Sequence, residues 1–495
     1  MSRFIPAQIK NWTKGELIQT TSAQAQPDRF YRGISTDTRS IRRGDVFVAL
    51  IGPNFDGHSF CQQAIDKGAS LLVLNAESKA GIDLKKRLEA GEDLPDLLLV
   101  ADTLKAYQCI AEGYRLTLLA TVIGITGSVG KTTTRRMISS ILCTQMKIHQ
   151  TKDNLNNQIG LPLTLLQADD GDDAIVAEMG MDRRGEIAVL SNVAHPDIAI
   201  ITGIGYSHAE YLGSRADILA EKTDIISGLK SNGIVLINGQ DSHLKKWALE
   251  NSDSKIWRIC NSEEDALDPE MSMFPVFWAE DVEIGYTNTK YTAKTNLDPA
   301  VAWHVEIPSP GKHLVRASLF GLAAAYCLGM DMDLAVKGCE NFSNTGNRQR
   351  LVETGGILLI DDTYNSSPES STSALDTLSL IADPNNRRKI VCISGMRELG
   401  SYSEEMHRRI AHKIYSIGVS KLYLVGEETK VIQDELTKMG ALVDVYYCQN
   451  SSDVRNLLLE EVREQDCILV KGSRFYTMEV ISQALEMQGR ENSHV

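Results

Sequence analysis

The sequence lacks any long apolar run. No stretch reaches the roughly 18 apolar residues that a membrane-spanning helix needs. Residues 1–8 have no apolar core of the kind that marks a secretory signal. Internal repeats and low-complexity tracts are also missing from the body of the chain. We therefore expect a protein without membrane insertion, located in the cytoplasm.

Paired cysteines and an excess of positive charge are missing too. The nine cysteines are scattered, without a C-x-x-C pair and without histidines at zinc spacing. Reduced thiols are therefore favoured over a disulfide framework or a zinc site. The net charge is −14, which argues against nucleic acid or an anionic membrane as partner. We expect a monomer that acts on small-molecule substrates; an acidic chain can still bind ATP, because a phosphate-binding loop acts locally.

The length of 495 residues suggests about three domains. Short apolar runs alternate with helical stretches throughout, which predicts an α/β fold. We expect a small N-terminal α/β domain over residues 1–110 and a central domain with a P-loop ATPase-type parallel sheet over residues 111–344. Residues 345–495 read as a doubly wound, Rossmann-like domain, although G-x-G-x-x-G does not follow its first strand.

One stretch of the central domain has the pattern of a phosphate-binding loop. The apolar run 122–125 reads as a buried strand, and residues 133–142 read as the helix that follows. The turn between them matches the short pattern G-x-x-G-K-T, with Ile125 where the longer pattern has glycine. Glycines let backbone N–H groups point at an anion, and the helix N-terminus adds a positive dipole end. The predicted nucleotide-binding residues are Gly127, Ser128, Val129, Gly130, Lys131, Thr132 and Thr133.

Three further polar residues lie at or beyond the ends of predicted central strands. Glu178 closes one strand, His208 follows the next, and Lys222 lies about four turns into the helical stretch after it. Ligands of parallel sheets bind beyond the carboxyl ends of the strands, and a carboxylate there suits Mg²⁺. A lone histidine is often structural and a lone lysine often solvated, so both interpretations of His208 and Lys222 stay open.

The N-terminal domain carries loops rich in hydroxyl, Arg and Asp groups. They cover residues 35–40, 42–45 and 54–58. Such groups can hold a polar, anionic ligand, but solvated turns would have the same composition.

Taken in order, these motifs resemble those of the Mur ligase family over nearly the whole chain. The resemblance implies an ATP-dependent amide ligase, and its details are most similar to members that add D-Ala-D-Ala to UDP-N-acetylmuramoyl-tripeptide through an acyl phosphate. The stretches that carry it are 37–39, 43–50, 55–58, 126–133, 154–164, 178–180, 205–208, 212–214, 221–222, 361–365, 398–400 with His407, and 471–474.

The resemblance also implies roles for individual residues. UDP-sugar would be held by Thr38, Arg39, Asp56 and His58. ATP would be contacted by the loop and by Asn157, Arg348, Asp361 and Asp362. Thr132 and Glu178 would bind one Mg²⁺, and His208 with a carbamylated Lys222 would bind a second, so that Lys131, Glu178, His208 and Lys222 are the predicted catalytic residues. The dipeptide side would use Asn365, Lys471 and Arg474.

Four positions depart from the family pattern. Leu314 and Ala317 stand where two asparagines are usual, Asp153 replaces a glycine, and Gly395 replaces an aspartate. These departures leave open a Mur-type paralogue that joins a different carboxylate and amine. A nucleotide-dependent regulatory protein without turnover is a further alternative, although the predicted catalytic residues are all present.

Overall fold

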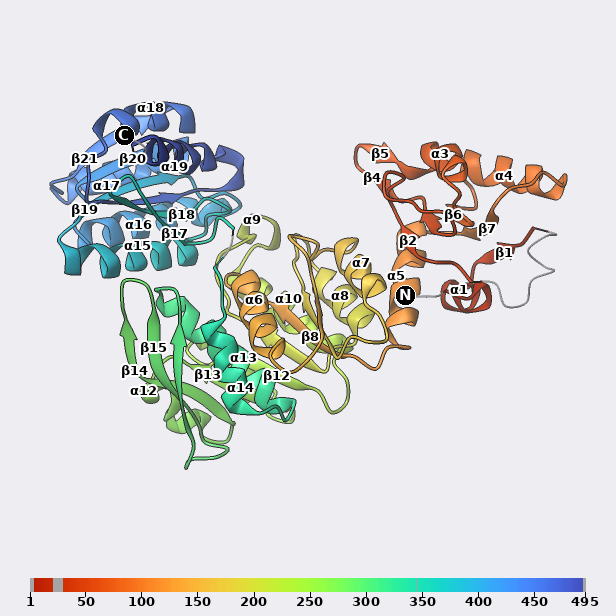
Figure 1. The fold of residues 1–495 in the computed structure, drawn as a ribbon, viewed down its shortest axis with the longest axis horizontal. Coiled ribbons are helices and arrows are strands. Elements are labelled where there is room, and N and C mark those ends of the chain that lie inside the picture. The colour runs from red at the N-terminus through yellow and green to blue at the C-terminus, as the bar shows by residue number, and fades with distance from the viewer. Residues whose placement is uncertain (1–3, 21–29, 345, 493–495) are drawn as a thin grey trace.

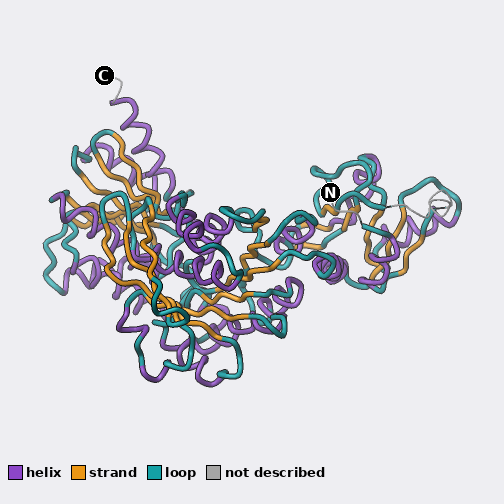
Figure 2. Tube along the Cα trace, turned by 60° about the horizontal axis from the view of Figure 1, so that its bottom comes forward, coloured by secondary structure: helices purple, strands orange, loops and turns teal. Residues whose placement is uncertain are grey.

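The computed structural model describes residues 4–20, 30–344 and 346–492 of the chain. These residues form three α/β domains, each built on its own main sheet. In Figure 1 the N-terminal domain lies at the right, the central domain in the middle and the C-terminal domain at the upper left. Figure 2 shows the strands of the N-terminal domain well separated from the other two sheets. The predicted fold class, a three-domain α/β protein, is confirmed.

The N-terminal domain has a five-stranded sheet in the order β1-β7-β6-β3-β2. Only β1 runs antiparallel to its neighbour. Its strands are β1 (Glu16–Ile18), β2 (Ile34–Ser35), β3 (Val46–Val48), β6 (Leu71–Asn75) and β7 (Asp96–Val100), with a separate hairpin of β4 (Ile51–Gly52) and β5 (Phe55–Asp56). Its helices are α1 (Pro6–Thr13), α3 (Cys61–Asp66), α4 (Lys79–Glu89) and α5 (Thr103–Arg115).

Helix α5 joins the N-terminal domain to the central one. Its residues Tyr107, Ile110 and Tyr114 are buried in one core with Leu161 and Ile187 of the central domain. The expected domain boundary at 110/111 therefore falls inside a continuous helix. The second expected boundary falls at position 345, which lies outside the described residues.

The central domain has a nine-stranded sheet in the order β16-β15-β14-β13-β12-β11-β8-β10-β9. Strands β8 to β14 are parallel, and β15 and β16 add an antiparallel edge. The strands are β8 (Thr121–Thr126), β9 (Ile148–Gln150), β10 (Ala174–Glu178), β11 (Ile198–Ile201), β12 (Ile234–Asn238), β13 (Ile256–Cys260), β14 (Val276–Ile284), β15 (Thr289–Thr295) and β16 (Ala302–Ile307).

Helices cover both faces of this sheet, because successive strand side chains point to opposite faces. Ile198 and Ile200 of β11 pack into the core under α6 and α13, whereas Ala199 and Ile201 pack into the core shared with α5. The helices are α6 (Lys131–Leu142), α7 (Gly160–Gln167), α8 (Glu186–Ala194), α9 (Ala209–Leu212), α10 (Arg215–Thr223), α11 (Ser242–Glu250), α12 (Glu263–Ala266), α13 (Lys312–Cys327) and α14 (Met332–Glu340).

The C-terminal domain has a six-stranded sheet in the order β17-β18-β22-β19-β20-β21. Five strands are parallel and β17 runs antiparallel along the edge. The strands are β17 (Arg350–Thr354), β18 (Ile357–Asp362), β19 (Arg388–Ser394), β20 (Lys421–Val425), β21 (Asp444–Cys448) and β22 (Asp466–Lys471). Helices α15 (Pro368–Ala382), α16 (Ser403–Ser416) and α17 (Lys430–Lys438) pack on one face, and α18 (Ser451–Glu461) and α19 (Glu479–Asn492) on the other.

Candidate active site

The predicted phosphate-binding loop connects β8 directly to α6. Gly127 and Gly130 have φ angles of 143° and 88°, in the region that favours glycine. A Cβ atom at Gly127 would lie 2.0 Å from Thr202 Oγ1, so this position has no room for a side chain. Helix α6 begins at Lys131, two residues earlier than predicted, because Gly130 serves as its N-cap. Its first N–H groups therefore border the turn.

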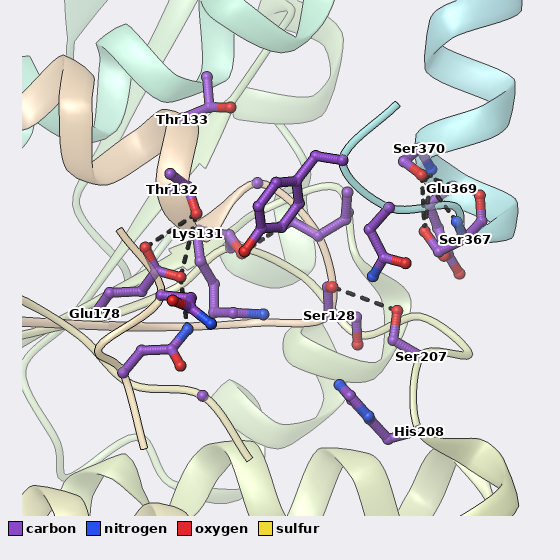
Figure 3. Close-up of a pocket in the computed structure, with 18 of the residues that line it drawn as sticks. Ser128, Lys131, Thr132, Thr133, Glu178, Ser207, His208, Ser367, Glu369 and Ser370 are labelled. Atoms are coloured by element: carbon purple, nitrogen blue, oxygen red, sulfur yellow. Dashed lines mark hydrogen bonds between the residues drawn. The ribbon is translucent and has the colours of Figure 1, made fainter. Parts of the chain in front are cut away.

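Glu178 lies beside the loop because β10 and β8 are parallel neighbours. Thr132 Oγ1 donates to its two carboxylate oxygens at 3.0 and 3.2 Å, as Figure 3 shows. Arg135 Nε donates at 3.2 Å and Asn156 Nδ2 at 2.9 Å. Glu178 is almost fully buried, so these donors compensate its charge inside the protein. We call these four residues the glutamate cluster; the sequence analysis had not assigned Arg135 or Asn156.

A cavity of about 650 Å³ lies between the central and C-terminal domains. From the loop it is lined by Ser128, Val129, Gly130, Lys131, Thr132 and Thr133, but not by Gly127. Glu178, His208 and Lys222 also line it, as predicted from the strand ends. From the other domain come Arg348, Asp362, Asn365 and Lys471. The structure therefore brings together most of the predicted central and C-terminal site residues.

Lys131 and Lys222 both reach this cavity, and both lie in low-dielectric surroundings. Lys131 Nζ donates to Gly127 O at 2.6 Å, and burial lowers the pKa of Lys131. Burial, followed by the nearby charge of Lys131, holds the pKa of Lys222 well below its usual value. Lys222 is 1% exposed, and its amine forms no hydrogen bond or ion pair with any residue that the structure describes. It lies in the last turn of α10, about two turns from the start rather than four.

His208 and Lys222 also line the cavity, and we call these two residues the lysine side. His208 is the N-cap of α9, with φ 65°. Its Nδ1 lies 2.8 Å from Glu398 Oε2 in the C-terminal domain. Figure 3 shows the imidazole ring directed from α9 toward the phosphate-binding loop.

The two adjacent aspartates of the C-terminal domain point in different directions. Asp362 lines the cavity and lies 3.0 Å from Lys471 Nζ. Burial raises the pKa of Asp362, while the charges of Lys471 and Arg348 oppose this shift. Asp361 instead pairs with Arg350 on β17 at 3.0 Å and does not line the cavity. Of the two predicted ATP contacts, only Asp362 is placed at the cavity.

Three more predicted site residues lie at the wall of this cavity or of an adjoining one: Arg348, Asn157 and Arg474. The guanidinium of Arg348 stacks 3.8 Å from the centre of the Tyr364 ring, at the cavity wall. Asn157 also lines the cavity, but its Oδ1 accepts from the N–H groups at the start of α7. Arg474 lines an adjoining cavity of about 450 Å³ together with Asn365.

The four predicted UDP-sugar residues lie in the N-terminal domain, and none of them lines this cavity. Thr38 Oγ1 donates to Gln63 at 2.7 Å, and Arg39 pairs with Asp37 at 2.6 Å. His58 uses both ring nitrogens within the domain: Nδ1 lies 2.6 Å from Asp56, and Nε2 accepts from the Asn75 N–H at 2.9 Å. Their role in substrate binding stays a prediction.

The departures from the family pattern have structural counterparts. Asp153 has φ 47°, a conformation in which glycine is common and aspartate is tolerated. A Cβ atom on Gly395 would lie 2.6 Å from Glu428 Oε2, so another carboxylate fills the space beside this glycine. Leu314 is buried in the core, whereas Ala317 lines the cavity together with His313 and Arg316.

No helix in the described ranges is both long and apolar enough to cross a membrane. Within those ranges no group of three or more His, Cys, Asp or Glu side chains is arranged around a common metal position. A monomeric state and a cytoplasmic location stay predictions.

Models of three family segments match the chain in order. Residues 30–114 match "Mur ligase family, catalytic domain", residues 125–325 match "Mur ligase middle domain", and residues 347–474 match "Mur ligase, glutamate ligase domain". The described order of three α/β domains agrees with this order of segments.

Relatives match over nearly the whole length. UDP-N-acetylmuramoyl-tripeptide--D-alanyl-D-alanine ligase of Bacillus subtilis is 32% identical, covering 94% of this chain and 96% of the relative. The protein of the same name from Escherichia coli is 30% identical, with coverages of 92% and 94%. The crystal structure of MurF from Acinetobacter baumannii superposes with a TM-score of 0.84 at 26% identity, covering 98% of this chain and 99% of that one. The chain therefore belongs to the Mur ligase family.

Proposed function

We propose that this protein is an ATP-dependent amide ligase that adds D-Ala-D-Ala to UDP-N-acetylmuramoyl-tripeptide, in the synthesis of the peptidoglycan precursor. The observation that carries the proposal is the shared cavity, in which a phosphate-binding loop faces polar groups of a second domain. The full-length similarity to ligases of this name supports the choice of substrates. It does not favour the paralogue with another carboxylate and amine.

ATP is held by its phosphates at the N-terminus of α6. Backbone N–H groups of residues 127–133 surround the phosphates, and Lys131 contacts the β and γ groups. Arg348 and Asp362 approach from the C-terminal domain, since both line the same cavity. Asn157 lines this cavity as well, and its Oδ1 accepts from the N–H group of Gly160 at the start of α7.

The glutamate cluster fits a magnesium ion by its chemistry. The Thr132 hydroxyl and the Glu178 carboxylate are adjacent oxygen donors, and Mg²⁺ is usually bound by one or two carboxylates together with substrate phosphates. Few protein ligands are then needed, which agrees with the lack of a larger carboxylate or histidine cluster in the described residues. Bound there, the ion neutralises charge on the phosphates.

The lysine side fits a second ion only if Lys222 is modified. An ammonium group cannot ligate a metal, whereas a carbamate is an anionic oxygen donor. A buried amine with a lowered pKa is neutral for a larger fraction of the time, and the neutral amine is the form that reacts with CO₂. We propose that carbamylated Lys222 and the neutral imidazole of His208 hold this ion.

The reaction has two displacements. A carboxylate oxygen of the tripeptide attacks the γ-phosphorus, an O–P bond forms, and the bond to the β-phosphate oxygen breaks to release ADP. The amine of D-Ala-D-Ala then attacks the acyl carbon of the acyl phosphate, a C–N bond forms, and the C–O bond breaks to release phosphate, with the amine proton passing to the phosphate or to water. The protein acts mainly by positioning the reactants and excluding water, which would hydrolyse the acyl phosphate.

The two substrates reach the site from opposite domains. Thr38, Arg39, Asp56 and His58 lie in the domain proposed to hold the UDP-sugar. Asn365, Lys471 and Arg474 are proposed to contact the dipeptide, because they line the cavity or the space adjoining it. Arg474 would pair with the dipeptide carboxylate, for which its planar guanidinium is well suited.

The test is phosphate release from ATP with Mg²⁺ and UDP-N-acetylmuramoyl-tripeptide, with and without D-Ala-D-Ala. We expect release only when the dipeptide is present, together with the mass of the UDP-pentapeptide. Both common diamino-acid forms of the tripeptide should be offered, and the Lys131→Ala variant is the control for contaminating ATPases. No release with either form, in a protein that still binds ATP, would overturn the proposed substrates.

A further inference from the structure

The segment around His208 is attached to the C-terminal domain. Tyr206 N–H donates to Glu369 Oε1 at 3.0 Å, and the Tyr206 ring packs 5.1 Å from that of Tyr402. Glu210 N–H donates to the carbonyl of Glu398 at 3.0 Å. Backbone contacts with the other domain therefore lie on both sides of His208 in the sequence.

Glu398 makes the one close polar contact to the His208 ring among the described residues. Its Oε2 lies 2.8 Å from Nδ1, whereas Asp182, the other carboxylate nearby, lies 3.7 Å away. Both His208 and Glu398 have a positive φ, 65° and 64°, so each backbone is held in an unusual conformation next to the contact. Two adjacent residues with such geometry, in different domains, indicate a specified contact rather than a chance approach.

Metal-binding histidines usually donate their second ring N–H to a carboxylate or a carbonyl group. That contact selects one tautomer, fixes the ring plane and leaves the other nitrogen free to bind the metal. At His208, the Glu398 carboxylate oxygen lies 2.8 Å from Nδ1 but not in the alignment of a hydrogen bond. Two lone pairs facing each other at this distance would repel, so the carboxylate favours a proton on Nδ1. The lone pair of Nε2 is then available, and the ring is directed toward the phosphate-binding loop (Figure 3).

We propose that Glu398 is a positioning residue, which holds His208 in the tautomer that can bind the second Mg²⁺. Because Glu398 belongs to the C-terminal domain, this half of the site is complete only when the two domains are in contact. Docking of the domains is thereby linked to metal binding. The part of this proposal that concerns Mg²⁺ rests on the proposed function. The tautomer of His208 in the metal-free protein does not depend on it.

The first measurement is nitrogen-15 NMR of the histidines in the full-length protein without metal or nucleotide, with His208→Gln used for assignment. We expect His208 to be protonated on Nδ1. In Glu398→Asn the side chain is too short to reach the ring, while asparagine tolerates the positive φ. This variant should give a mixture of tautomers. Glu398→Gln keeps the length and an acceptor oxygen and should largely restore the wild-type signal.

The second measurement is Mn²⁺ binding followed by electron paramagnetic resonance, with a non-hydrolysable ATP analogue present. Glu398→Asn should raise the dissociation constant of the weaker of the two Mn²⁺ sites by about 10- to 100-fold, which is the usual effect of losing such a carboxylate. Glu398→Gln should lie between this variant and the wild type. Asp182→Asn is the matched control and should leave the His208 NMR signal unchanged.

Two results would overturn the proposal. One is an unchanged His208 tautomer in Glu398→Asn. The other is unchanged Mn²⁺ binding combined with a raised KM for the amino substrate, which would mean that Glu398 contacts the substrate itself. Failure of the proposed substrates would leave the NMR result intact, so the two failures can be distinguished.

Discussion

The glutamate cluster and the lysine side lie at one cavity but are built in different ways. All members of the glutamate cluster come from the central domain, and three donors already satisfy Glu178. On the lysine side, Lys222 has no polar partner in the described part of the chain, and the His208 ring contacts the Glu398 carboxylate of another domain at 2.8 Å. The first group is preorganised within one folding unit, whereas the second includes a contact between domains and, in the proposed function, needs a modification of Lys222. The predictions below test this difference.

The largest effect is expected at the loop shared by both groups. Lys131→Ala removes the cation that reaches the phosphates, and turnover should fall by about 10²- to 10³-fold, as for other preorganised charge contacts. Phosphate release and unfolding by urea should be measured together. A variant that folds normally and keeps its turnover would show that the loop does not hold the transferred phosphate.

Lys222→Ala tests the lysine side alone. We expect turnover to fall by about 10²-fold, the cost of one metal contact. Carbon-13 NMR of protein equilibrated with labelled bicarbonate should show a carbamate signal in the wild type that is missing in the variant. ATP binding should persist, because the glutamate cluster is intact. Full activity of Lys222→Ala would rule out the carbamate, and lost ATP binding would contradict the independence of the two groups.

The rigidity of the loop beside the glutamate cluster can be tested at Gly127. Gly127→Ala places a Cβ atom 2.0 Å from Thr202 Oγ1 at φ 143°, and should lower the free energy of unfolding by about 2 to 4 kcal/mol. Gly185→Ala is the matched control, because its φ is 83° but no atom of the described residues lies within 4 Å of the added carbon. It should cost about 1 to 2 kcal/mol. If urea titrations gave equal losses of unfolding free energy for the two variants, the loop would have rearranged to accommodate the added methyl group.

His313 also lines the shared cavity, and among the described residues its buried Nδ1 has no hydrogen-bond partner. Burial lowers the pKa of His313 to about 4. Between pH 6.5 and 4 the unfolded chain binds a proton that the folded protein does not, so stability should fall as the pH is lowered through this window. The loss should be about 1 to 3 kcal/mol. His313→Gln should have a smaller pH slope of the unfolding free energy over the same window; equal slopes would contradict this origin.

The strands that carry the site were predictable because their apolar runs are short and lie between clear breaks. The predicted run 174–178 matches β10 residue for residue, and Glu178 closes it. The position of Lys222 was misjudged because two helices replace the single helix expected. Gly213 ends α9, and Ser214 begins α10 with a capping box completed by Asp217. Both signals are present in the sequence and could have corrected the count.

The direction of Asp361 depended on an element that was not predicted. Strand β17 is short, half-exposed and antiparallel, and its Arg350 lies opposite Asp361 in the register. Successive strand residues point to opposite faces, so the pairing of Asp361 with Arg350 leaves only Asp362 for the cavity. Without knowledge of β17, nothing in the sequence distinguishes Asp361 from Asp362 as a residue that faces the cavity.

Contacts between domains were beyond prediction from sequence patterns. Arg135 could have been found, since it lies three residues after Thr132 on the same helix face. The contact between Glu398 and His208 could not have been found, because the two residues are 190 positions apart in the sequence. No local periodicity encodes how two separately folded sheets approach one another.

Helix α5 has a practical consequence for anyone who dissects this protein. Because Tyr107, Ile110 and Tyr114 belong to the same core as Leu161, a fragment cut after residue 110 would expose an apolar strip on the catalytic half. Expression of that half alone should begin no later than Thr103, the first residue of the helix. A chimaera that exchanges the N-terminal domain with that of a relative should likewise be joined before α5, in the turn after β7.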